Sequence, residues 1–116
     1  MDNVFDVIAG EIWTVGMAHM YILECSDGTL YVGSTRNLEY RLQQHAAGEG
    51  AEYTKKRRPV ALRWAAETDS VAQAYAWEKQ VQGWSRKKRE ALILGDFDLI
   101  SELSRRRSGR QPDAGG

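Results

Sequence analysis

Two tyrosines, an arginine, a histidine and a glutamate have the types and spacing that hydrolysis of a phosphodiester needs. These residues are Tyr21, Tyr31, Arg41, His45 and Glu78. Such a reaction needs a base to deprotonate water and a cation beside the scissile phosphate. It also needs something to neutralise the leaving oxygen, usually a metal ion held by a carboxylate.

The residue types match these tasks. A tyrosine can act as the base when an arginine or a metal ion lowers its pKa of ~10. An arginine donates two parallel hydrogen bonds to a phosphate, and one carboxylate with several waters is ordinary coordination for Mg²⁺. Each type also has a plainer interpretation, because tyrosines pack well in strands, charged helix residues are usually solvated and a lone histidine is more often structural.

The two tyrosines lie in a predicted β-hairpin. The strand-like runs at 20–25 and 30–33 flank the pair Asp27-Gly28. Such a pair is the strongest short-range hairpin signal, because both turn residues must tolerate a positive φ.

A helix is expected directly after the hairpin, with Asn37 as its cap. Arg41 and His45 are four residues apart, so they share one helix face. We expect this face to be exposed and to offer a guanidinium and an imidazole to one site. The helix should end near the glycines at 48–50, within a polar connection over 46–58.

Later segments supply one more strand and three more helices. Pro59 opens a strand-like run at 60–66, because proline is tolerated at the first position of a strand. Ser70 and Ser85 are candidate caps of two helices, and a shorter helix is expected over 97–103. This order predicts an α+β domain, a small three-stranded antiparallel sheet flanked by three or four helices.

Glu78 lies beside the apolar stripe of the helix that follows Ser70, between Ala74 and Val81. A carboxylate in that position needs a partner or a function. A salt bridge at the boundary of the core is the plainer alternative.

The length of 116 residues and the 42% hydrophobic content are typical of one globular domain. We assign the domain to residues 17–104, with a flexible acidic extension at 1–16 and a disordered tail at 105–116. The single cysteine, Cys25, excludes a disulfide framework and a cysteine-rich zinc site. The sequence has no membrane-length apolar run and no signal peptide, so we expect a cytoplasmic protein with no membrane association.

The formal net charge of 0 hides an uneven distribution. Residues 36–93 carry 12 basic and 7 acidic side chains, and eight of the basic ones occur in two runs. Clusters of this kind suit a polyanion, although solvated loops and helix ends explain them equally well. The candidate phosphate-binding residues are Lys55, Lys56, Arg57, Arg58, Arg86, Lys87, Lys88 and Arg89.

The hairpin and its following helix resemble the GIY-YIG nuclease superfamily, in which two strands carry tyrosine motifs and the next helix an arginine. His19-Met20-Tyr21 stands in place of Gly-Ile-Tyr and keeps only the tyrosine, whereas Tyr31-Val32-Gly33 matches Tyr-Ile-Gly well. The resemblance extends over residues 17–95 and is closest to the small stand-alone, single-domain bacterial branch.

This resemblance implies a metal-dependent endonuclease that cuts DNA. Branched, nicked and single-stranded forms are the candidate substrates. Tyr31 would be the general base, and Tyr21 would position the water or share that role. Arg41, at the position of the family's catalytic arginine, would stabilise the transition-state phosphate, and His45 would hydrogen-bond the tyrosine or the phosphate. Glu78 would bind one Mg²⁺ or Mn²⁺.

Two departures from the family pattern keep other functions open. Ser34 stands where some members carry a lysine, and Glu90 stands where some carry an asparagine. One alternative is therefore a module that binds nucleic acid or recruits a partner without catalysis. Another is a structural subunit whose acidic residues 1–16 cover the basic face. The chain is expected to act as a monomer or a weak homodimer.

Overall fold

A computed structural model describes residues 17–105 of the chain. The predicted extension at 1–16 and all of the predicted tail except Arg105 lie outside the described residues. The described part divides between Gln82 and Gly83 into two compact units. In chain order the first unit contains β1 (Ala18–Glu24), β2 (Leu30–Thr35), α2 (Leu38–Ala47), α3 (Glu52–Lys55), β3 (Ala61–Thr68) and α4 (Val71–Gln82). The second contains α5 (Arg86–Leu94) and a helix over 97–105.

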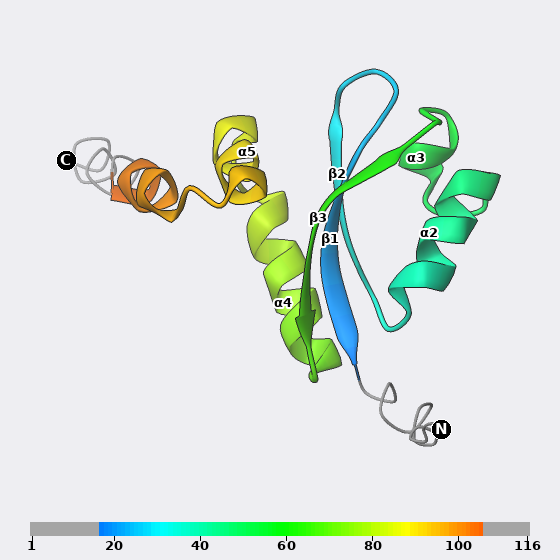
Figure 1. The fold of residues 1–116 in the computed structure, drawn as a ribbon, viewed down its shortest axis with the longest axis horizontal. Coiled ribbons are helices and arrows are strands. Elements are labelled where there is room, and N and C mark those ends of the chain that lie inside the picture. Colours follow the sequence, from blue (N-terminus) through cyan, green and yellow to red (C-terminus); the bar gives the residue numbers. More distant parts are fainter. Residues whose placement is uncertain (1–16, 106–116) are drawn as a thin grey trace. The chain divides into compact units, whose positions relative to one another are not determined.

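The three strands form one antiparallel sheet in the order β2-β1-β3. The central strand β1 is buried along most of its length, which explains why Met20, Tyr21, Ile22 and Leu23 form an unbroken apolar run rather than an alternating one. In Figure 1, α4 lies on one side of this sheet, and α2 with α3 lies on the other. The predicted α+β class and its three-stranded antiparallel sheet are confirmed.

The hairpin turn differs from the prediction. Of its two expected positive-φ residues, only Gly28 has one, at +84°. The turn is a longer loop, in which the backbone N–H of Cys25 donates to the carbonyl oxygen of Thr29 at 2.8 Å. The Asp27 side chain accepts hydrogen bonds from both the N–H and the hydroxyl of Thr29, so Asp27 stabilises the loop through its carboxylate.

The predicted helix caps are confirmed. The side chain of Asn37 accepts from the N–H of Tyr40, and Ser70 and Ser85 accept from N–H groups three residues further on. Gly48 and Gly95 end their helices in the left-handed conformation that favours glycine.

One helix was not predicted. The expected polar connection over 46–58 contains α3, a single helical turn whose N-cap Ala51 makes no side-chain hydrogen bond. Within residues 17–105 this turn brings the helical segments to five. A four-residue turn without a side-chain cap has no local signal for a sequence pattern to detect.

Candidate active site

A buried chain of hydrogen bonds joins β1, α2 and α3. The Tyr21 hydroxyl lies 2.9 Å from Nε2 of His45, and Nδ1 of the same ring lies 2.8 Å from Oγ1 of Thr54. The Thr54 hydroxyl in turn donates to the carbonyl oxygen of Ala51 at 3.1 Å. Tyr21, His45 and Thr54 are each at most 1% exposed, so water does not compete for these bonds.

The chain of bonds fixes where the protons are. A hydroxyl has one proton, and that of Thr54 is directed to Ala51, so Thr54 Oγ1 accepts from Nδ1–H of His45. In the neutral ring Nε2 is then the acceptor, and Tyr21 donates its hydroxyl proton to it. Burial lowers the pKa of His45 to about 4, with the nearby Arg41 charge acting in the same direction, so the ring is neutral at physiological pH.

The prediction that His45 lies on an exposed helix face was wrong. The imidazole is fully buried, because this face of α2 turns toward the sheet and pairs with Tyr21. Arg41, one turn earlier on α2, is half-buried and donates to Gln44 at 3.0 Å. The prediction that Arg41 and His45 share a face of α2 is thus correct, but only the Arg41 guanidinium is partly exposed.

Both tyrosines have raised pKa values. Burial raises the pKa of Tyr21 to about 12 and also raises the pKa of Tyr31. The Arg41 guanidinium opposes this in both cases through hydrogen bonding and charge, whereas the Glu78 carboxylate adds to it. Arg41 and Glu78 therefore lie within electrostatic range of both phenols, although they come from α2 and α4.

Tyr31 is the more accessible of the two phenols. It is half-buried, and its ring centroid lies 5.4 Å from that of His45 and 6.4 Å from that of Tyr21. The ring of Tyr53 stacks on it at 6.1 Å with an interplanar angle of 22°. These contacts hold the Tyr31 ring in place without tying its hydroxyl to the histidine.

Glu78 has the partner that its position beside the apolar stripe required. The Ser34 hydroxyl donates to Oε1 of Glu78 at 2.5 Å, and the Gln82 amide donates to Oε2 at 2.7 Å. Gln82 also donates to the carbonyl oxygen of Val32, which ties the end of α4 to β2. Ser34, identified in the sequence only as a departure from the family pattern, thus orients the predicted metal ligand.

Two glycines leave room for the tyrosine–histidine pair. A Cβ atom on Gly33 would lie 2.6 Å from the Tyr21 hydroxyl oxygen. A Cβ atom on Gly50 would lie 2.5 Å from Nδ1 of His45. The sequence contained a signal for the first, which belongs to a tyrosine motif, but Gly50 was interpreted only as part of a helix end.

Part of the first basic run is engaged within the fold. Arg57 pairs with Asp27 at 3.0 Å, and its guanidinium carbon lies 3.8 Å from the centroid of the Tyr53 ring. Arg58 donates to the carbonyl oxygens of Lys55 and Ala46. These two arginines hold the segment around α3 in place, while the side chains of Lys55 and Lys56 are exposed.

The second basic run lies in the second unit and includes α5. Arg86 pairs with Glu90 at 2.6 Å, and the Lys88 ammonium lies 4.4 Å from the Trp84 ring centroid. Lys87 is exposed. Glu90 thus serves as the partner of an arginine on its own helix.

The residue set fits a lightly held divalent cation. Residues 17–105 contain no group of three or more His, Cys, Asp or Glu side chains that could hold a metal ion. Glu78 supplies a single carboxylate, and each of its oxygens keeps a lone pair after accepting one hydrogen bond. One carboxylate with waters and a substrate phosphate is the usual coordination of Mg²⁺.

Residues 17–91 match the GIY-YIG catalytic domain, and the chain belongs to this family. It is 45% identical over 77 residues to UPF0213 protein VNG_2274C of Halobacterium salinarum, covering 66% of this chain and 100% of that protein. It is 49% identical over 76 residues to a UPF0213 protein of Syntrophus aciditrophicus, covering 65% and 87%. The solution NMR structure of UPF0213 protein BH0048 from Bacillus halodurans is 40% identical, with a TM-score of 0.45, and covers 66% of this chain and 82% of that one.

The small-protein relatives confirm the predicted branch of the superfamily, and the domain is of nuclease type. Among residues 17–105, no helix has the length and apolar character needed to cross a membrane. The cytoplasmic location stays a prediction.

Proposed function

We propose that this protein is an endonuclease that hydrolyses phosphodiester bonds in DNA with the help of Mg²⁺ or Mn²⁺. The observation that supports this best is that the charges of Arg41, from α2, and of Glu78, from α4, both act on the two phenols, whose ring centroids lie 6.4 Å apart. A base, a cation and a metal-binding carboxylate are the groups that phosphodiester hydrolysis needs.

In this proposal Tyr31 accepts the proton of the attacking water. Tyr31 suits this role better than Tyr21, because it is half-buried and its hydroxyl is not tied to His45. The Arg41 guanidinium lowers the pKa of the Tyr31 phenol and is positioned to bind the phosphate as negative charge develops on it.

Tyr21 and His45 have a positioning role. Because Tyr21 is buried and donates its proton to Nε2 of His45, it does not touch the water itself; its ring, 6.4 Å from that of Tyr31, helps to hold the Tyr31 phenol in place. Thr54 holds His45 in the tautomer that this requires.

Glu78 would hold the metal ion, with Ser34 and Gln82 orienting its two oxygens. When bound there, a divalent cation supplies charge neutralisation at the phosphate and the leaving oxygen. The exposed Lys55, Lys56 and Lys87 would contact phosphates without reading sequence, so DNA affinity should fall steeply as salt rises.

The test compares cleavage of labelled branched, single-stranded and duplex DNA with Mg²⁺, Mn²⁺ or EDTA. Arg41→Ala and Glu78→Gln should each abolish metal-dependent cleavage while DNA is still bound. Glu39→Gln is the matched control, because Glu39 is an exposed glutamate of the first unit. Cleavage that survives both site substitutions would show that the residues are wrongly assigned.

A second candidate function is a DNA-binding module without catalysis. The raised pKa of both phenols favours it, since a protonated phenol is a poor base. Wild-type protein that binds all three DNA forms but cuts none of them in either metal would establish the module instead.

A further inference from the structure

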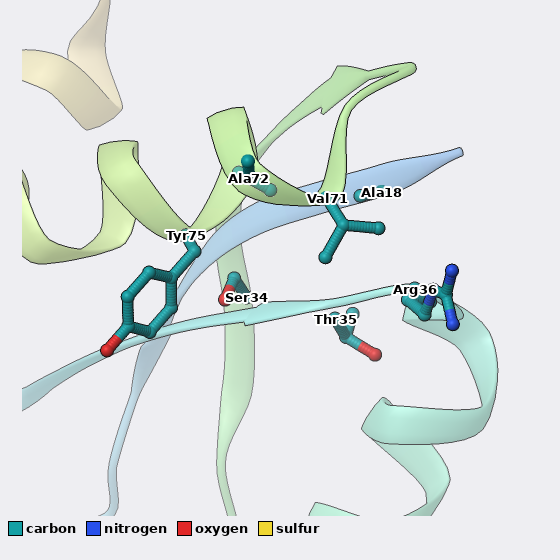
Figure 2. A pocket seen from close by; sticks show the side chains of 8 residues that line it. Ala18, Ser34, Thr35, Arg36, Val71, Ala72 and Tyr75 are labelled. Carbon is teal, nitrogen blue, oxygen red and sulfur yellow. The ribbon is translucent and has the colours of Figure 1, made fainter. Parts of the chain in front are cut away.

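A cavity of about 580 Å³ lies beside the Ser34–Glu78 pair, between α4 and the sheet. Ser34, Thr35 and Arg36 line it from the end of β2, and Val71 and Tyr75 line it from α4. Figure 2 shows Tyr75 and Arg36 at opposite ends of the cavity, with Ser34, Thr35 and Val71 between them. All lining residues belong to the first unit.

The cavity is directly connected to the proposed metal site. Ser34 contributes to its wall, and the hydroxyl of the same residue donates to Glu78. Tyr75 and Glu78 are three residues apart on α4, so they share a helix face and are separated by about 4.5 Å along the axis. A base that stacks on Tyr75 could therefore belong to a nucleotide next to the phosphate at Glu78.

The lining favours an aromatic, anionic occupant. Tyr75 is 54% exposed and Val71 is 41% exposed, so an aromatic ring and an aliphatic side chain are both accessible to an occupant of the cavity. The Lys79 ammonium lies 4.9 Å from the centroid of the Tyr75 ring, and Arg36 adds a second cation at the other end. Within residues 17–105 the cavity wall carries no acidic side chain.

We propose that this cavity holds the base of one unpaired nucleotide next to the phosphodiester that is cut. The base would stack on Tyr75, and Arg36 and Lys79 would contact the flanking phosphates. This inference rests on the proposed nuclease function and narrows its substrate class. A base within a duplex is covered on both faces and paired at its edge, so the cavity favours single-stranded or branched DNA over an intact duplex.

Binding in EDTA tests the proposal without cleavage. The probe is a short single-stranded oligonucleotide with 2-aminopurine at one position, scanned along the strand, because stacking on an aromatic ring quenches its fluorescence. Wild type should quench one position strongly. Tyr75→Ala should lose this quenching and bind about 10-fold more weakly, whereas Tyr75→Phe should behave as wild type. Tyr40→Ala is the matched control, because Tyr40 is 57% exposed on α2, outside the cavity.

An abasic site at the quenched position makes the test specific. It should weaken binding of wild type to the level of Tyr75→Ala, and Tyr75→Ala should not distinguish the abasic strand from the intact one. Equal binding by wild type and Tyr75→Ala would overturn the proposal. The proposal would also be overturned if Tyr75→Ala lost as much affinity for the abasic strand as for the intact one. A change in the sedimentation of the Tyr75→Ala protein would overturn it too, because it would identify a second copy of the chain as the occupant of the cavity.

The cleavage assay separates this proposal from the function on which it rests. Metal-dependent cleavage by wild type without base-dependent quenching would remove the cavity proposal and leave the nuclease. Quenching at one position without cleavage would support the proposal that the cavity binds a base and would overturn the proposed hydrolytic activity. Failure of wild type to bind any DNA would overturn both.

Discussion

Thr54→Val tests the hydrogen-bond chain that positions Tyr21. The substitution replaces the Thr54 hydroxyl with a methyl group and keeps the β-branched shape, so the packing around residue 54 should change little. It removes the acceptor of Nδ1–H of His45, which lies 2.8 Å away in the native protein. Because both residues are fully buried, no water replaces the lost partner.

The size of the effect follows from this burial. A buried polar group left without a partner costs about 1–3 kcal/mol. If His45 instead moves its proton to Nε2, Nδ1 loses its partner and the Tyr21 hydroxyl becomes an acceptor, so one buried group is unsatisfied in either tautomer. With a urea m-value of about 1–2 kcal/mol/M, the unfolding midpoint should fall by roughly 0.5–3 M.

Two measurements check this prediction. Urea unfolding gives the stability, and ¹⁵N NMR of the imidazole gives the tautomer, which should be Nδ1-protonated in wild type. Thr54→Ser keeps the hydroxyl, so it should keep the tautomer and lose only about 1 kcal/mol for the missing methyl group. Wild type with Nε2 protonated, or Thr54→Val that unfolds at the same urea concentration as wild type, would refute the reasoning.

Three further predictions concern neighbouring groups. The protein should lose roughly 3 kcal/mol of stability as the pH falls from 6.5 toward 4. In this range the unfolded chain binds a proton at His45, whereas the buried native ring, with its pKa of about 4, does not. His45→Asn should flatten this part of the stability–pH profile. Gly33→Ala should destabilise the fold by about 1–3 kcal/mol in thermal or urea unfolding, because its Cβ would lie 2.6 Å from the Tyr21 hydroxyl. Ser34→Ala should weaken Mn²⁺ binding at Glu78 by about 10-fold in a titration followed by electron paramagnetic resonance, and Ser34→Thr should restore it.

Each of these has a contradicting result. If His45→Asn loses as much stability as wild type between pH 6.5 and 4, the pH dependence comes from carboxylates instead of His45. A Gly33→Ala protein as stable as wild type would mean that the Tyr21 ring can move aside. Equal Mn²⁺ affinity in wild type and Ser34→Ala would mean that Glu78 needs no orienting partner.

Local patterns were enough to predict the three strands and the capped helices, but not α3. The caps at Asn37, Ser70 and Ser85 were predictable because a cap is a contact between residues three positions apart. The spacing of Arg41 and His45 likewise fixed their common helix face. It could not show which neighbour covers that face, so the buried state of His45 was missed.

The contacts that complete the site join distant residues and have no local signature. Ser34 and Glu78 are 44 positions apart, and Arg57 and Asp27 are 30 positions apart. Thr54 reaches His45 only because an unpredicted helical turn places it there. The sequence therefore identified the groups that could react, whereas their partners became visible only in three dimensions.

The imidazole of His45 joins a strand and two helices, and this bears on how the chain can evolve. Selection for a folded protein alone is enough to retain Tyr21, His45 and Thr54, since each loses a buried partner when another is replaced. If the proposed function holds, a descendant that loses the reaction can keep all three. Drift after such a loss should appear first at Arg41 and Glu78, so these two positions are better markers of an active lineage than the buried tyrosine and histidine.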